Sequence, residues 1–140
     1  MTRVCLLLFA CLVAAAGCSI NTTPTPPTTT NPTILTEVFS GTINMNGGAS
    51  HSFVSQASGT VRVTLNSLAP DPTQIVGLSL GTWTGTSCQV VVAADRATQL
   101  SSITGSVTTT ASGSLCARVY DVGTITAGSP VTYQVTVDHP

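Results

Sequence analysis

The sequence predicts an all-β protein whose folded part is a single antiparallel β-sandwich of about eight strands, of the jelly-roll or Ig-like kind. Apolar and polar residues alternate along residues 61–65 and 131–137, and this period of two turns one side of a strand toward a core. The 25 Thr residues and the many Val residues are β-branched and pack well on a pleated sheet. No comparable stretch has the period of an amphipathic helix.

Turn signals divide residues 34–140 into short segments, as in other sandwiches. Gly, Asn, Pro and Asp cluster at residues 46–48, 70–72 and 128–130, among other places. Between these signals the residues are rich in Val, Thr, Ile and Leu. We expect strands at residues 36–43, 50–56, 59–68, 75–82, 88–94, 98–108, 114–121 and 130–138.

Charge is scarce throughout the chain. Only 6% of the residues are charged, and four Arg with no Lys cannot build the basic surface that a nucleic-acid backbone requires. The plentiful Val, Ile and Leu also argue against disorder of the whole chain. We therefore expect a folded domain that binds no nucleic acid.

The first 18 residues have the character of an export signal. Arg3 precedes about 13 apolar residues, which is too few for a bilayer core that needs roughly 20 helical residues. The next residues, Ala15-Ala16-Gly17-Cys18, resemble the lipobox of bacterial lipoproteins, and this resemblance implies cleavage before Cys18 and acylation of its thiol. The alternative is an ordinary secretory signal, cleaved after Ala16, that leaves Cys18 as a free thiol.

Three regions follow from this interpretation. Residues 1–17 are expected to be the signal peptide, residues 18–33 a lipidated Cys with a disordered Thr/Pro-rich tether, and residues 34–140 the sandwich domain. In an extended conformation the tether would reach roughly 40 Å. Acyl chains on Cys18 would bind membrane lipid firmly. Ser19, in place of the Asp that resembles an inner-membrane retention signal, favours the outer membrane of a bacterial envelope.

Two cysteines remain after Cys18 is lipidated. Cys88 and Cys116 both fall in expected strands, and an exported protein meets an oxidising compartment. We expect a disulfide between them, which would stabilise the fold by roughly 3 kcal/mol through restriction of the unfolded chain. The alternative is a pair of separate buried thiols.

Parts of the folded segment resemble the bacterial pre-peptidase C-terminal (PPC) domain family. Residues 113–123, followed by residues 130–137, are similar to the end of that domain, and residues 39–43 and 50–53 are similar to its opening strands. The resemblance spans about residues 37–138. It implies a β-sandwich that is an accessory to secreted peptidases and has no catalytic residues of its own.

Aromatic residues are the first candidates for a ligand site. Trp83 lies at the end of an expected strand, between Gly81 and Gly85. An exposed indole there would stack on a sugar ring or on a protein partner, because an aromatic face offers a large contact area. A position that closes one end of the core is the interpretation we prefer, and we expect core positions for Tyr120 and Tyr133 as well.

Acidic residues are the second candidates. Asp121, together with Asp71 and Asp95, would supply oxygen ligands for Ca²⁺ if their loops converged. Turn capping is the simpler role for such isolated aspartates. In particular, we expect Asp95 and Arg96 to form a turn pair.

The remaining titratable residues suggest no catalytic machinery. We expect His51 to be an ordinary strand or surface residue, His139 to be solvated, and Arg118 to lie in a strand with its guanidinium in water. Motifs of the Gly-x-Ser-x-Gly, His-Glu-x-x-His and phosphate-loop kinds do not occur. We therefore expect no enzyme activity, no metal and no cofactor.

These observations together predict an exported, membrane-anchored lipoprotein that displays a non-catalytic PPC-like sandwich to a protein or glycan partner. Two alternatives remain open. One is a binding module that depends on carbohydrate or Ca²⁺, with Trp83 and Asp121 as possible ligand-binding residues. The other is a structural envelope protein that associates with itself.

Overall fold

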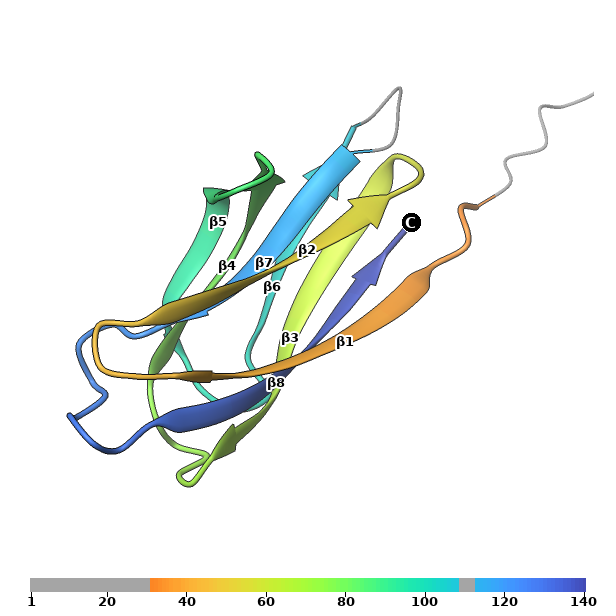
Figure 1. Cartoon of the computed structure of the whole chain (residues 1–140). Helices are drawn as coiled ribbons and strands as arrows, with labels where there is room; N and C mark the ends of the chain where they lie inside the picture. Colours follow the sequence, from red (N-terminus) through yellow and green to blue (C-terminus); the bar gives the residue numbers. More distant parts are fainter. Residues whose placement is uncertain (1–30, 109–112) are drawn as a thin grey trace, which may run out of the picture.

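Eight β-strands in two sheets make up the folded domain (Figure 1). The computed structural model describes residues 31–108 and 113–140, so the expected signal peptide, Cys18 and most of the tether lie outside the described residues. The strands are β1 (Leu35–Ile43), β2 (Gly48–Ser55), β3 (Gly59–Ala69), β4 (Val76–Trp83), β5 (Cys88–Ala97), β6 (Ser102–Val107), β7 (Gly113–Tyr120) and β8 (Val131–His139). All eight expected strands are confirmed. The largest difference is the start of β6, which is Ser102 rather than residue 98.

The order of the strands is that of a jelly roll. One sheet, here called sheet A, has the order β1-β8-β3-β6, and the other, sheet B, has the order β2-β7-β4-β5. All the paired strands are antiparallel. Of the consecutive strands, only β4 and β5 are neighbours in one sheet. An Ig domain keeps its first two strands in one sheet, so this connectivity excludes the Ig-like alternative.

The core lies between the two sheets and is built by the alternation seen in the sequence. From β3 and β8, Val63, Leu65, Val135 and Val137 are fully buried on the inner face of sheet A. Burial of such a side chain contributes roughly 1.5–3 kcal/mol relative to exposure. Tyr133 is 3% exposed, so its expected core position is confirmed.

Hydroxyl side chains cover most of the outer face of sheet A. Every second residue of its strands points away from the core, and these residues are mostly Thr and Ser: Thr36, Ser40, Thr42, Thr60, Thr104, Ser106 and Thr132. Hydroxyl groups bind water without charge and Thr suits a pleated surface. This face accounts for a composition that is rich in Thr and poor in charge.

The end of β8 differs from the expectation, because His139 is only 1% exposed rather than solvated. The alternation of β8 continues through His139 and turns its ring inward, where it lies 5.0 Å from the ring of Phe53. Its Nε2 is 2.9 Å from Oε1 of Glu37 on β1. The next residue, Pro140, accepts a hydrogen bond from the Ser55 hydroxyl at 3.0 Å. His139 is therefore part of the packing between the sheets.

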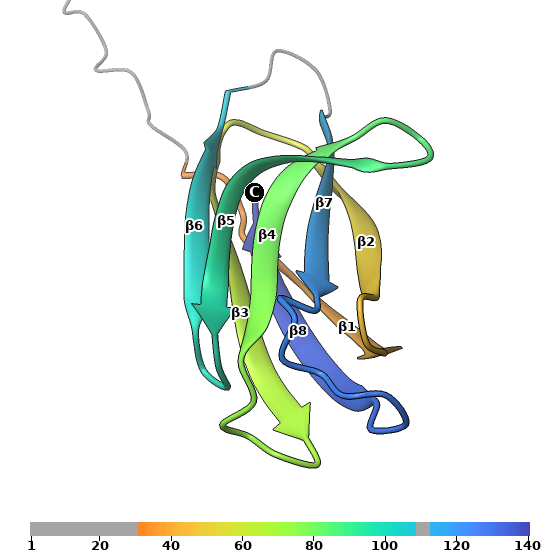
Figure 2. The same cartoon turned by 90° about the vertical axis from the view of Figure 1, so that its left-hand side faces the viewer.

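The first residues of β5 pair with β4 but also lie partly over its outer face. The expected disulfide between Cys88 and Cys116 is confirmed, and it joins β5 to β7 although β4 lies between these two strands. Strands two places apart in a flat sheet are about 9.6 Å apart. The two cysteine Cα atoms are only 5.8 Å apart. In Figure 2 the first part of β5 accordingly runs across β4.

Gly81 of β4 makes this crossing possible. A Cβ atom at this position would lie 2.0 Å from the carbonyl oxygen of Gln89 and 3.0 Å from the Cα of Val90. Both neighbours are backbone atoms of β5, which cannot move without displacing the strand. Only glycine lets β5 pass close enough for Cys88 to reach Cys116.

We predict that Gly81→Ala destabilises the domain by about 2–3 kcal/mol, the cost typical of overpacking, and leaves part of the Cys88 and Cys116 thiols unpaired. Urea unfolding and thiol titration of the denatured protein measure the two effects. Gly113→Ala is the matched control, since a Cβ there meets nothing within 4 Å. Equal stabilities of the two variants would contradict the role given to Gly81.

Candidate functional site

Two β-bulges in β5 shape the surface of sheet B. Val92 and Val90 pair with consecutive residues of β4, so Val91 is an extra residue between them. Farther along, Asp95 and Arg96 together lie opposite the single residue Gly77. A bulge bends its strand and re-aims side chains. Each bulge of β5 borders a hollow.

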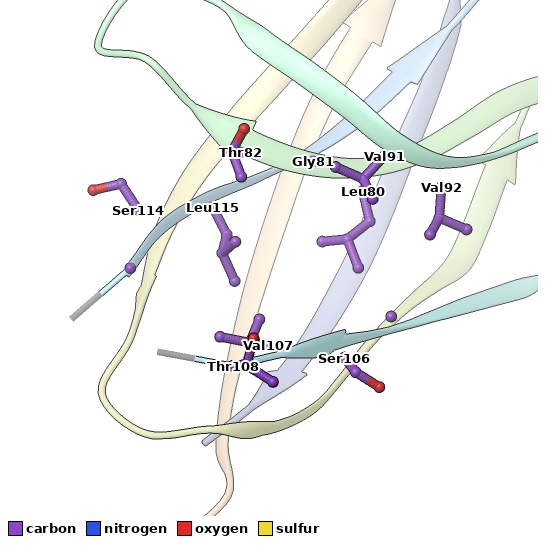
Figure 3. Close-up of a pocket in the computed structure, with 12 residues that line it drawn as sticks. Leu80, Gly81, Thr82, Val91, Val92, Ser106, Val107, Thr108, Ser114 and Leu115 are labelled. Atoms are coloured by element: carbon purple, nitrogen blue, oxygen red, sulfur yellow. The ribbon is translucent and has the colours of Figure 1, made fainter. Parts of the chain in front are cut away.

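The first hollow is an apolar cleft between the sheets (Figure 3). It opens where β5 and β6, the edge strands of different sheets, lie side by side (Figure 2). Leu80 and Leu115 point from sheet B toward Val107 of β6, and Val91 and Val92 of β5 complete the apolar lining. The cleft has a volume of about 380 Å³, within the range of pockets that hold small ligands.

Gly105 of β6 leaves space for this cleft. A Cβ atom at Gly105 would be 2.8 Å from Cδ2 of Leu80, the residue on the opposite wall. Glycines and residues with hydroxyl side chains make up the rest of the lining: Gly81, Thr82, Ser106, Thr108, Gly113 and Ser114. Of these, Ser106 directs its side chain to the outer face of sheet A. None of the described lining residues carries a titratable side chain. The cleft thus offers van der Waals contact and a few hydroxyls, and it holds no acid, base or nucleophile-base pair.

The second hollow is polar and borders the other bulge. It has a volume of about 560 Å³ and is lined by Ile75, Asp95, Arg96, Tyr120, Val122 and Thr124. The hydroxyl of Tyr120 donates a short hydrogen bond to Oδ1 of Asp95. Burial, and the carboxylate of Asp95 beside the hydroxyl, raise the pKa of Tyr120 to about 12. Tyr120 is partly exposed on the outer face of sheet B, so the expectation of a core position was wrong.

The expected turn pair of Asp95 and Arg96 was also wrong, because both residues lie inside β5. The bulge is the physical reason, since it accommodates two polar residues without ending the strand. Arg118 lies in β7 as expected, and its guanidinium carbon is 5.3 Å from the centroid of the Tyr120 ring.

Asp121 holds the loop between β7 and β8. Its Oδ1 accepts hydrogen bonds from the backbone N–H groups of Gly123, Thr124 and Ile125 at 2.9 to 3.1 Å, and its Oδ2 accepts one from Asn46. Slight burial acts to raise the pKa of Asp121, but the four hydrogen bonds outweigh it and the pKa is lowered. Asp121 is therefore a turn cap.

Asp71 is a turn cap of the same kind. It accepts hydrogen bonds from the backbone N–H and the hydroxyl of Thr73, at 2.8 and 2.7 Å, which lower its pKa. Within residues 31–108 and 113–140, no three His, Cys, Asp or Glu side chains gather as a metal site requires. The structure thus brings Asp71, Asp95 and Asp121 to no common site.

Trp83 ends β4 and is only half-buried, so it does not belong to the core. It shares the outer face of sheet B with Gly81, since the side chains of a strand alternate. Its backbone neighbour across the ladder is Cys88. Trp83 lines neither hollow.

A partly buried polar pair connects the two sheets on the side of β1 and β2. Nε2 of His51, on β2, is 2.7 Å from the hydroxyl of Tyr133, on β8. The ring of Phe39 stacks on His51 at 4.9 Å. Burial lowers the pKa of His51 and raises that of Tyr133. His51 is thus a strand residue, as expected, with a specific inter-sheet partner.

Comparisons with known proteins add little to this picture. No family model matches the chain, and no curated protein sequence matches it. The chain is similar to the crystal structure of the Yersinia pseudotuberculosis-derived mitogen, with 16% identity and a TM-score of 0.49, over 77% of this chain and 85% of that chain. A likeness at this level carries no information about ligand or activity. Over the described residues, no helix has the length and apolar character to cross a bilayer.

Sequence reasoning named Asp95, Arg96 and Tyr120 in other roles and missed both hollows, although the bulges that border them left a signal. Residues 90–92 are three consecutive valines, and residues 93–97 read Ala-Ala-Asp-Arg-Ala. Neither stretch keeps the period of two. Such interruptions inside a predicted strand indicate bulges, which often lie near functional sites.

We predict that the free energy of unfolding decreases as the pH falls from about 7 to 5, and that His51→Gln removes part of this decrease. The folded pKa of His51 lies below the unfolded value of 6.5. The unfolded chain therefore binds more protons in this range, and protonation favours unfolding. The Gln amide retains a hydrogen-bond donor for Tyr133.

Urea unfolding at pH 8, 6.5 and 5 measures this dependence in both proteins. Asp71 and Asp121 titrate below this range, because their pKa values are lowered from 3.8. An identical pH slope in the wild type and in His51→Gln would refute the assignment.

Proposed function

We propose that the chain is an exported bacterial lipoprotein, anchored through Cys18 to the outer membrane, whose jelly-roll domain binds an uncharged hydrocarbon chain without catalysing a reaction. The observation that carries this proposal is the cleft between β5 and β6. Its walls are Leu and Val side chains with a few hydroxyls, and its volume is about 380 Å³.

The chemistry of the cleft selects an apolar ligand. A charged group placed among Leu80, Val107 and Leu115 would lose its hydration and gain no ionic partner, which costs several kcal/mol. A hydrocarbon chain gains about 25 cal/mol for each Å² of apolar surface removed from water. A protein held at a membrane surface has such chains as its neighbours.

Export is supported by the disulfide and by the first 18 residues. A disulfide persists in oxidising compartments and is rare in the cytosol. The signal-like residues 1–17 and the lipobox-like residues before Cys18 point to the same compartment. The PPC-like stretches agree with a non-catalytic role, and membership of that family stays a prediction.

We predict that Cys18→Ala moves the protein from the envelope fraction to the soluble exported fraction, because acyl chains on Cys18 supply the anchor. Fractionation of cells, followed by intact-mass measurement, checks this result. Cys88→Ala with Cys116→Ala is the control, since it removes the disulfide and two cysteines without removing the anchor. Envelope association of Cys18→Ala, or a wild-type mass without acyl chains, would disprove the anchor.

We predict that Val91→Asp weakens the binding of a hydrocarbon chain to the cleft. The yield of photo-crosslinked product at the cleft is expected to fall at least tenfold. Val91 is 73% exposed, so the substitution changes stability by less than about 0.5 kcal/mol while it places a carboxylate at the cleft. The probe is a long-chain alcohol that carries a diazirine, photo-crosslinked to the full chain in detergent and mapped by mass spectrometry.

Val38→Asp is the matched control for this experiment. Val38 is 57% exposed and lies on β1, away from the cleft. We expect the Val38→Asp variant to be labelled as strongly as the wild type, on the peptides that contain Val91, Val107 and Leu115. Labelling that is equal in both variants, or that is spread over the outer face of sheet A, would overturn the apolar-ligand proposal.

A further inference from the structure

The polar hollow beside the second bulge plays no part in the proposed function. Its concentration of charged side chains is the first indication of a separate binding site. The described residues carry eight charged side chains: Glu37, Arg62, Asp71, Asp95, Arg96, Arg118, Asp121 and Asp138. Two of them, Asp95 and Arg96, line this hollow, and two more contact its lining residues: Arg118 lies against Tyr120, and Asp121 accepts a hydrogen bond from Thr124. Charged side chains are therefore more frequent around this hollow than over the rest of the described residues.

Tyr120 provides a fixed aromatic surface in this hollow. A Cβ atom at Gly77 would be 2.2 Å from two carbons of the Tyr120 ring, so the ring lies directly against the backbone of β4. The hydroxyl is bonded to one of these two carbons, and its hydrogen bond to Asp95 fixes the same edge of the ring. A ring held by these contacts loses little side-chain entropy when a ligand packs on it. Ile75 and Val122 extend the apolar surface.

Among the lining side chains, the hydrogen-bond donors that remain free belong to Arg96, because the hydroxyls of Tyr120 and Thr124 already donate to Asp95 and to the carbonyl of Ile75. Asp95 already accepts a hydrogen bond from Tyr120, and both oxygens of Asp121 accept from backbone N–H groups. Arg96 is exposed, and its guanidinium has no hydrogen bond or ion pair among the described residues. A guanidinium presents paired N–H donors whose spacing matches a carboxylate.

We propose that this hollow binds an acidic saccharide, with the apolar face of a sugar ring packed on Tyr120 and a carboxylate of the sugar paired with Arg96. A small inorganic anion would use Arg96 but not the aromatic ring. A neutral sugar would use the ring but leave the guanidinium without an ionic partner. Only a ligand with both features uses the whole surface.

A glycan array with uronic-acid, sialic-acid and neutral oligosaccharides tests the proposal, with the full chain in detergent. We expect at least one acidic glycan to bind. Tyr120→Ala and Arg96→Gln are each expected to weaken its binding tenfold or more. Tyr120→Phe keeps the ring and is expected to retain most of the affinity, which separates stacking from the hydrogen bond to Asp95.

Arg62→Gln is the matched control, because it removes one Arg from sheet A, outside the hollow. We expect its binding to be unchanged, and thermal unfolding verifies that each variant is folded. The proposal is overturned if no acidic glycan binds, if neutral glycans bind as tightly, or if Arg96→Gln and Arg62→Gln behave alike. Val91→Asp leaves this hollow intact, so failure of the apolar cleft does not affect the result.

Discussion

The passage of β5 across β4 at Gly81 is the constraint on which the functional surface depends. Backbone atoms of Gln89 and Val90 occupy the space of the missing side chain, and the disulfide between Cys88 and Cys116 fastens the crossing strand to β7. Strand β5 pairs regularly with β4 from Cys88 to Val90, and beyond the crossing its register shifts at two bulges. The two hollows lie at these bulges.

The two hollows differ in chemistry because their bulges contain different residues. The extra residue of the first bulge is Val91, which faces a cleft without titratable groups. The second bulge contains Asp95 and Arg96, next to an aromatic ring that Gly77 allows to lie against the sheet. One strand thereby presents an apolar and a polar surface. The proposed lipid-anchored display module would use both surfaces without any catalytic group.

Sequence reasoning predicted the structure correctly where the alternation of apolar and polar residues shows which side chains are buried. The alternation along β3 and β8 predicted both strands and the inward position of Tyr133, because a strand with one buried face must repeat every two residues. It failed for His139, whose place near the end of the chain suggested solvent although the same alternation turns it inward. It also failed for Tyr120, which has the spacing of a strand residue but lies on the outer face.

Composition and periodicity alone were sufficient for the all-β class and the eight strands, since these depend on side-chain size and branching. The disulfide partners followed from the expected export and from the two cysteines left in the folded segment. The jelly-roll order, the crossing at Gly81 and the meeting of Asp95, Arg96 and Tyr120 became known only from the folded chain. They arise from contacts between strands that are distant in sequence, where packing between the sheets selects one arrangement among several that share the same local pattern.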